Sequence, residues 1–278
     1  MKIMGGIILF NPDIQRLKEN VNSISSQVDL LYMIDNCSSN VEEIERMFND
    51  VGNIIIVKNA ENNGVAKALN QIMALAMNQA VDWVLTLDQD SICPHDLIEK
   101  CLRYIKMKNI GIICPEIIDS KVNILLTERN IELDYEFVNR CITSAALTNV
   151  EICRKVGFFN DELFIDYVDF DYCAKLRINN YKILRMNDVT LNHQLGDSKL
   201  KSLFFREFRV TNHTAFRKYY IARNITYYIR KYRKEINVNL EYLRIIKVLI
   251  FTMLFESDKK EKIKNLFRGI IHGMKMKI

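Results

Sequence analysis

Residues 82–91 have the sequence DWVLTLDQDS, an apolar run that ends in two carboxylates, Asp88 and Asp90. Short apolar runs of the same kind, bounded by turn-forming residues, recur at 3–10, 28–34, 53–58 and 109–114. Helical patterns lie between them, at 13–25, 41–49, 64–79 and 95–107. Strands that alternate with helices in this way predict an α/β fold, in which a mostly parallel, twisted sheet has helices on both faces.

Ligands of such sheets bind beyond the carboxyl ends of the strands, so the residues after each apolar run are the first candidates for a site. Two carboxylates two residues apart on an extended backbone point the same way. Their hard oxygen atoms suit a divalent cation, which in turn could bridge a diphosphate. The structural alternative is that Asp90 or Ser91 caps a helix that Pro94 opens. No glycine-rich dinucleotide or P-loop motif occurs, so a nucleotide would have to be held differently.

Residues 161–171, DELFIDYVDFD, form a second acidic segment. We expect a helix from Val168 to Asn179, with Asn180 in the left-handed conformation that ends it. Asp169 would then lie one turn inside the helix beside apolar side chains, a setting that raises a carboxyl pKa and suits a general base. The alternative is that the acids gather at a helix start because the helix dipole favours them there.

The remaining reactive side chains give weaker signals. His193 follows a strand-like run and could contact a metal ion or a phosphate, although a structural or exposed histidine is equally compatible with the pattern. The seven cysteines are odd in number and include no C-x-x-C pair, which predicts buried, reduced thiols of a cytoplasmic protein. No signature of a serine or cysteine nucleophile is present, so acyl-transfer chemistry has no support.

The composition is that of an ordinary globular chain, because 278 residues with 49% hydrophobic and 26% charged side chains can bury a sizeable core. We find no secretory signal pattern at the N-terminus and no apolar stretch approaching the roughly 18–20 residues that span a bilayer. We therefore expect a cytoplasmic protein without a transmembrane helix.

Charge is distributed unevenly along the chain. Residues 1–200 hold 20 Lys and Arg against 28 Asp and Glu, whereas residues 201–278 hold 19 against 6. Charge alone would allow nucleic acid, an anionic membrane or phosphorylated substrates as partners of the basic tail. Because the tail is predicted to be helical with apolar stripes, we expect peripheral docking on the inner face of a membrane and no nucleic-acid partner. Packing onto the catalytic domain or onto a second subunit, giving a homo-oligomer, is the alternative.

Seven motifs in one order give the chain a family resemblance. They are FNP (10–12), IDNCSSN (34–40), ENNGVAKALN (61–70), LDQDS (87–91), GFFNDELFIDYVDFDYCAKLRINNYKI (157–183), LNHQLGD (191–197) and RKYYIARN (217–224). Together they resemble the family-2 inverting glycosyltransferases of the GT-A fold, and most closely the bacterial rhamnosyltransferase-like group. The resemblance covers about residues 3–230, and an ordered set of motifs is much more specific than a single D-x-D.

The resemblance implies functions for individual residues. The implied donor site consists of Phe10, Asn11, Asp35, Asn63, Gly64, Asn70, Asp88, Asp90 and Arg223. In that site Asp35 accepts a hydrogen bond from the pyrimidine ring, and Asp88 contacts the ribose. Asp90 holds Mg²⁺ or Mn²⁺ on the donor diphosphate, with assistance from His193. Asp169 matches the general base. Arg223 and Asn224 match a segment near the leaving diphosphate or the acceptor, and a solvated helix face is the alternative for them.

The resemblance also implies the overall organisation and the reaction. A GT-A catalytic domain would span 1–205, with a nucleotide-sugar half at 1–115 and an acceptor half at 116–205, and a basic helical extension would follow at 206–278. The reaction would be the inverting transfer of a sugar, with rhamnose as first choice, from a dTDP or UDP donor. The acceptor would be a hydroxyl of a glycan or lipid-linked molecule in bacterial surface polysaccharide synthesis. The alternatives are a UDP-hexose or UDP-galactofuranose donor, a nucleotidyltransferase and a non-enzymatic adaptor.

Two positions depart from the family pattern. Ser144-Ala145 stands where the family often has Ser-Gly, which puts a close backbone approach there in doubt because alanine disfavours left-handed geometry. Asn180 replaces the usual glycine before Tyr181, and asparagine tolerates the left-handed turn expected there.

Overall fold

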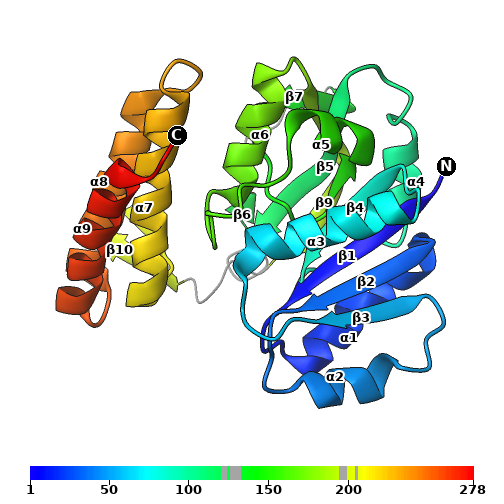
Figure 1. Cartoon of the computed structure of the whole chain (residues 1–278). Coiled ribbons are helices and arrows are strands. Elements are labelled where there is room, and N and C mark those ends of the chain that lie inside the picture. Colours follow the sequence, from blue (N-terminus) through cyan, green and yellow to red (C-terminus); the bar gives the residue numbers. More distant parts are fainter. Residues whose placement is uncertain (120–123, 126–132, 194–198, 204–205) are drawn as a thin grey trace.

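The first half of the chain forms a parallel sheet in the order β3-β2-β1-β4 (Figure 1). The structure is a computed structural model, and it describes residues 1–119, 124–125, 133–193, 199–203 and 206–278. The strands are β1 (Ile3–Leu9), β2 (Leu30–Asp35), β3 (Ile54–Lys58) and β4 (Trp83–Asp88). The connecting elements are α1 (Ile14–Ile24), the 3-10 turn η1 (Ser25–Gln27), α2 (Val41–Phe48) and α3 (Gly64–Asn78). These elements confirm the strand and helix alternation predicted from the sequence.

An antiparallel strand joins this half to the rest of the sheet. β8 (Ala146–Asn149) lies between β4 and β5 (Ile110–Asp119) and pairs antiparallel with both. β9 (Lys182–His193) then pairs parallel with β5, and β7 (Tyr135–Val138) pairs antiparallel with β9. The other elements here are α4 (Leu97–Leu102), β6 (Ile124–Leu125), α5 (Val150–Val156), α6 (Val168–Ile178) and the hairpin of β10 (Lys199–Leu203) and β11 (Arg206–Val210). The whole sheet is therefore mixed.

Two apolar layers cover the two faces of the sheet. Along β2 the side chains alternate, so that Leu31 and Met33 pack into one layer while Tyr32 and Ile34 pack into the other. This alternation follows from the two-residue repeat of a strand. The layer with Leu31 includes side chains of α1, α2 and α4, and the layer with Tyr32 includes side chains of α3, α5 and α6. A sheet covered on both faces fits the continuously apolar strands of the sequence.

Two details near the ends of helices test the sequence predictions. The helix expected at 95–107 is wrong in extent, because α4 spans only Leu97–Leu102. After it, the amides of Tyr104 and Met107 donate to carbonyls three residues back, so the chain continues as tight turns. Pro94 thus lies before the helix and does not open it. Asn180, with φ of 60°, confirms the expected left-handed residue after α6.

Three helices complete the chain: α7 (Ala215–Tyr232), α8 (Val238–Phe255) and α9 (Lys259–Lys275) (Figure 1). α9 packs closely on α7 through Gly269 and Gly273. A Cβ atom at either glycine would lie 2.3 Å from a backbone oxygen of α7, at Tyr219 or Arg223. Small residues four apart therefore let the two backbones touch. Among the described residues, no helix combines the length and the apolar character that a membrane span requires.

Candidate functional site

Asp35 is a buried carboxylate at the carboxyl end of β2. Its side chain is 1% exposed, and Oδ2 accepts a hydrogen bond of 2.9 Å from the Ser38 amide. The other oxygen, Oδ1, has no hydrogen-bond partner among the described residues. A buried charged oxygen without a partner is costly, so Oδ1 is suited to accept a hydrogen bond from a ligand.

The loops after β1, β2 and β4 are tied together around this carboxylate. The Phe10 amide donates to Gln89 Oε1 at 2.8 Å, and the Asn11 amide donates to Ser38 Oγ at 2.8 Å. Asn11 has φ of 48°, which turns the chain sharply after β1. The Phe10 side chain is 47% exposed, so it is open to a ligand at the strand ends. Gln89 and Ser38 have no sequence signal of their own, because their importance lies in contacts between loops distant in sequence.

The loop before α3 brings a third segment close to these strand ends. Gly64 has φ of 80°, and a Cβ atom there would lie 2.6 Å from the carbonyl oxygen of Phe164. Only glycine fits this crowded left-handed position. Asn63 precedes Gly64 at the start of α3 and is half-buried. Asn70 bonds to the backbone of Phe159 and to Asp161, so it holds the acidic segment against α3.

Asp88 and Asp90 lie where β4 ends, and their backbone is held on both sides. Asn20 Nδ2 donates to the Asp88 carbonyl at 2.6 Å, and Arg16 Nε donates to the Asp90 carbonyl at 2.8 Å. The Ser91 amide donates to the Asp88 carbonyl, which means that the chain turns directly after Asp88. The expectation that an extended backbone aligns the two carboxylates is therefore wrong.

The alternative interpretation of Asp90 and Ser91 as helix caps is also wrong, because Asp96 is the N-cap residue of α4. Ser91 is buried, and its hydroxyl lies 2.6 Å from the Ser144 hydroxyl.

Next to Ser144, Ala145 has φ of 59° and is fully buried, and its amide donates to the Thr86 carbonyl at 2.8 Å. The close backbone approach that the Ser-Gly pattern provides is thus present with alanine.

Asp169 lies in the first turn of α6, which begins at Val168. The predicted start of the helix at Val168 is confirmed, directly after the left-handed residues Asp166 and Tyr167. Asp169 is thus the second helical residue and lies in the first turn, not one turn inside the helix as expected. Asp169 Oδ1 accepts a 2.8 Å hydrogen bond from the Phe170 amide. Burial, and to a smaller extent the charges of Asp166 and Asp88, raise the pKa of Asp169 to about 7. A carboxyl with this pKa can take up a proton near neutral pH.

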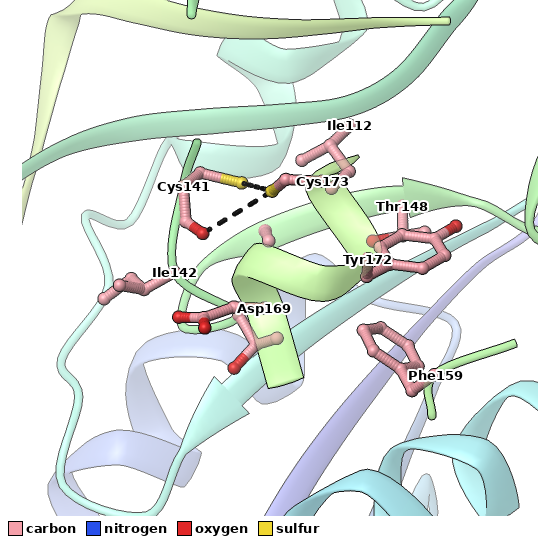
Figure 2. Close-up of a pocket in the computed structure, with 10 residues that line it drawn as sticks. Ile112, Cys141, Ile142, Thr148, Phe159, Asp169, Tyr172 and Cys173 are labelled. Carbon is pink, nitrogen blue, oxygen red and sulfur yellow. Dashed lines mark hydrogen bonds between the residues drawn. The ribbon is translucent and has the colours of Figure 1, made fainter. Parts of the chain in front are cut away.

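Asp169 is one of the residues that line a small cavity (Figure 2). Its volume is about 10 Å³, room for roughly one water molecule, and its lining includes Phe159, Tyr172 and the thiols of Cys141 and Cys173. Burial raises the pKa of the Cys153 thiol to about 11, and the pKa of Cys141 is also raised well above its usual value. These thiols stay protonated at neutral pH. The prediction of buried thiols is confirmed for five of the seven cysteines, but Cys141 is half-buried and the prediction is wrong for Cys37, which is exposed.

Arg217 of α7 connects the C-terminal helices to this acidic site. Its Nε lies 3.1 Å from Asp166 Oδ2 and its Nη2 lies 3.0 Å from Asp166 Oδ1. The charges of Asp166, Asp88 and Asp169 all raise the pKa of Arg217. Asp88, Asp166, Asp169 and Arg217 are therefore close enough to interact electrostatically, although they come from β4, the start of α6 and α7.

Asp90 lies in a different hollow from Asp169. It lines a cavity of about 480 Å³ together with Asp13, Arg16, Glu19 and two glutamines. The charge of Asp88 contributes to the raised pKa of Asp169, so these two carboxylates lie within electrostatic range of each other. The described residues contain no cluster of three or more metal-binding side chains. The backbone of His193 pairs with Asp119 at the end of β9, and its side chain lies outside the described residues.

Arg223 and Asn224 differ in what they contact. Asn224 is fully buried and donates to the carbonyls of Ile165 and Asp166, so it fixes the turn that precedes α6. Arg223 donates to the Glu162 carbonyl, and its guanidinium lies 4.6 Å from the Tyr220 ring centre. Both residues position the acidic segment. The motif RKYYIARN contains Arg217 as well as these two residues, but only the contact with Asp166 identifies Arg217 as a site residue.

Residues 6–184 match the model of glycosyl transferase family 2, and the chain belongs to that family. The family resemblance stated from the motifs is thereby confirmed.

One relative matches nearly the whole chain. The protein is 25% identical over 283 residues to dTDP-rhamnosyl transferase RfbF of Shigella flexneri, a match that covers 95% of this chain and 92% of that protein.

Solved structures confirm the GT-A fold. S. aureus TarS 1-349 in complex with UDP-GlcNAc has a TM-score of 0.57 and 13% identity, covering 98% of this chain and 81% of that chain. GalNAc-T7 with UDP, GalNAc and Mn²⁺ has a TM-score of 0.56 and 14% identity. That match covers 73% of this chain, which spans less than half (44%) of the GalNAc-T7 chain.

Proposed function

We propose that this glycosyltransferase moves rhamnose, with inversion, from a dTDP-linked donor to a hydroxyl of a glycan or lipid-linked acceptor in bacterial surface polysaccharide synthesis. The observation that supports the proposal is the raised pKa of Asp169, which is about 7. Asp169 also lies within electrostatic range of Asp88 and of the Asp166–Arg217 pair. The rhamnose and dTDP assignments rest on the full-length similarity to the Shigella flexneri enzyme.

The proposed donor site uses the strand ends described above. The unpartnered Oδ1 of Asp35 would accept the N3–H of a pyrimidine base, and Phe10, Asn11, Asn63 and Gly64 would border the nucleoside. Asp88 would contact the ribose. Arg223 would stay near the diphosphate, while Asn70 would support the pocket from behind through its bonds to Phe159 and Asp161. The GT-A domain at 1–205, its halves at 1–115 and 116–205, and the extension at 206–278 remain proposals.

The residues present fit a divalent cation. Asp88 and Asp90 supply hard carboxylate oxygens where β4 ends, which are the ligands that such a cation prefers. We propose that Asp90 would hold Mg²⁺ or Mn²⁺, with His193 as a further contact. When bound, the ion would neutralise charge on the departing nucleoside diphosphate.

Asp169 would act as the general base. Its carboxylate would accept the proton of the acceptor hydroxyl while that oxygen attacks the anomeric carbon from the face opposite the diphosphate. One C–O bond forms as the bond to the diphosphate breaks, so a single displacement inverts the anomeric centre. Arg217 would keep Asp166 in place beside the base and limit the repulsion among the three carboxylates.

The decisive test is a panel of nucleotide sugars with the full-length protein and each metal. We expect metal-dependent hydrolysis of dTDP-rhamnose, with release of dTDP and the inverted configuration in the product observed by NMR. Preference for a UDP-hexose or UDP-galactofuranose would retain the mechanism but overturn the donor assignment. Release of pyrophosphate would identify a nucleotidyltransferase and overturn the proposal.

A further inference from the structure

Helix α8 is turned with its polar residues inward. Its only buried side chains are Glu241 and Thr252. Val238 and Ile245 pack partly buried against the cluster that includes Tyr228. Other apolar side chains point outward, and Leu243, Ile246 and Leu254 are 59%, 49% and 51% exposed. A helix that is apolar around most of its surface is normally buried, so we expect the outer face of α8 to bind another surface.

Buried polar contacts fix this orientation. Glu241, 0% exposed, accepts hydrogen bonds from Arg140, Arg244 and the Tyr167 hydroxyl, the last at 2.6 Å. At the other end of the helix, buried Glu256 pairs with Lys218 of α7 and Lys262 of α9. Because breaking buried ion pairs is costly, rotating α8 to bury its apolar face would be strongly unfavourable.

Helix α9 extends the apolar surface. Phe267, Ile271 and Met274 recur at helical spacing and are 53%, 46% and 52% exposed. Gly269 and Gly273 lie against the backbone of α7, and this close contact sets the orientation of α9. The outward apolar side chains of α8 and α9 are called the tail face below.

Exposed charge on these two helices is almost entirely positive. Glu261 is the one exposed acid on α8 and α9. The two helices carry six exposed cations, which are Lys247, Lys259, Lys260, Lys264, Arg268 and Lys275. Two covers are conceivable for an apolar face with this charge. In a two-fold dimer the same patch meets itself, so its cations would approach one another. An anionic lipid surface instead attracts every one of them.

We propose that the tail face docks the protein on an anionic membrane, with the apolar side chains in the headgroup region and the cations among acidic lipid headgroups. The inference about docking is independent of catalysis, but its use, presenting a lipid-linked acceptor, rests on the proposed function. α7 joins the two, because it packs on α9 through the two glycines and reaches Asp166 through Arg217.

The test is flotation of the full-length protein with vesicles of phosphatidylcholine, with and without phosphatidylglycerol, at low and high salt. We expect binding to the anionic vesicles, weakened by salt, and little binding to pure phosphatidylcholine. The double variant Ile246→Glu with Ile250→Glu should lower the partition coefficient by a factor of about 100 or more, since two apolar side chains lose their burial. Its matched control is Ile178→Glu with Leu102→Glu, two residues that are 48% and 38% exposed elsewhere, against 49% and 40% for Ile246 and Ile250.

A second pair of variants separates charge from apolar contact. Lys264→Gln with Arg268→Gln should weaken binding about thirtyfold, whereas Lys18→Gln with Lys67→Gln, on the catalytic domain, should leave it unchanged. All four variants should hydrolyse the donor as the wild type does, which separates docking from the catalytic proposal. Absence of binding to anionic vesicles would overturn the inference. So would a stable dimer without vesicle binding that Ile246→Glu with Ile250→Glu splits into monomers.

Discussion

Arg217 binds Asp166 through two of its nitrogen atoms, at 3.0 and 3.1 Å, and this pair joins α7 to the turn before α6. The same turn leads into Asp169 three residues later. The position and the ionisation of the proposed base therefore depend on a helix that lies about fifty residues further along the chain, at Arg217. This contact makes α7 part of the site.

Replacement of Asp166 tests that connection through the pH profile. Asp166→Asn removes a negative charge that raises the pKa of Asp169 and leaves Arg217 without its carboxylate. Both changes favour the ionised base, so the acid limb of the kcat profile should move to lower pH by roughly 0.5–1 unit. Glu162→Gln, an exposed neighbouring change, should leave the profile unchanged. A limb that stays in place, or moves to higher pH, would contradict the electrostatic assignment.

Replacement of the base tests the chemistry itself. Asp169→Asn cannot accept the acceptor proton, so transfer should fall by about 10²–10⁴-fold, while donor affinity measured by calorimetry stays close to that of the wild type. Wild-type activity should decline as the pH falls through about 7, because protonation removes the base. Normal turnover by a correctly folded Asp169→Asn enzyme would show that another group takes the proton.

The same residue should affect stability with pH. The folded-state pKa of Asp169 is raised from 3.8 to about 7, so between these values the folded protein retains a proton that the unfolded chain has lost. The free energy of unfolding should thus decrease as pH rises across this window, on the order of 2–3 kcal/mol for a partly exposed group. Asp169→Asn should be more stable than the wild type at pH above 7 in urea unfolding, and the difference should vanish near pH 4. If the wild type and Asp169→Asn were equally stable both above pH 7 and near pH 4, the raised pKa of Asp169 would be refuted.

Asp90 is expected to act through the cation. Asp90→Ala should weaken donor binding in the presence of Mn²⁺ or Mg²⁺ by about tenfold or more, as expected for the loss of a charged contact, and should have little effect when the metal is chelated. Titration of the nucleoside diphosphate with and without metal measures this. Asp96→Ala, on the same loop and away from the strand end, is the control. An identical loss in both conditions would assign Asp90 a purely structural role.

Asp35 should determine affinity for the base of the donor. Asp35→Asn retains the size of the side chain but removes the charged acceptor, so the donor KM should rise about 10–100-fold with a smaller effect on kcat. Competition by free thymidine and uridine nucleotides, compared with an adenine nucleotide, separates base recognition from diphosphate binding. Unchanged competition by the pyrimidines would remove Asp35 from the proposed pocket.

The sequence by itself determined the parallel half of the sheet, its alternating helices and the family. The length and apolar pattern of runs such as 82–87 are sufficient to predict strands. The order of the motifs can be read directly from the sequence, and it identifies the family. The sequence did not predict elements that depend on tertiary contacts. One example is β8, whose four residues form a strand because they pair with β4 on one side and β5 on the other. The start of α6 at Val168 was predicted correctly, but the left-handed backbone of Asp166 and Tyr167 directly before it was not, because it depends on contacts such as those of Arg217 and Asn224.

Only the tertiary structure decided which acids share a site and which face of the tail is outward. The pKa of Asp169 depends on burial and on Asp88, some eighty residues away, and such long-range charge effects have no local sequence pattern. Glu241 binds Arg140 and Tyr167 on the inner side of α8, and these contacts keep the apolar surface of the helix outward. Hydrophobic periodicity alone would predict the opposite orientation. Local sequence fixes which elements form, whereas packing between distant segments fixes their surroundings and hence their chemistry.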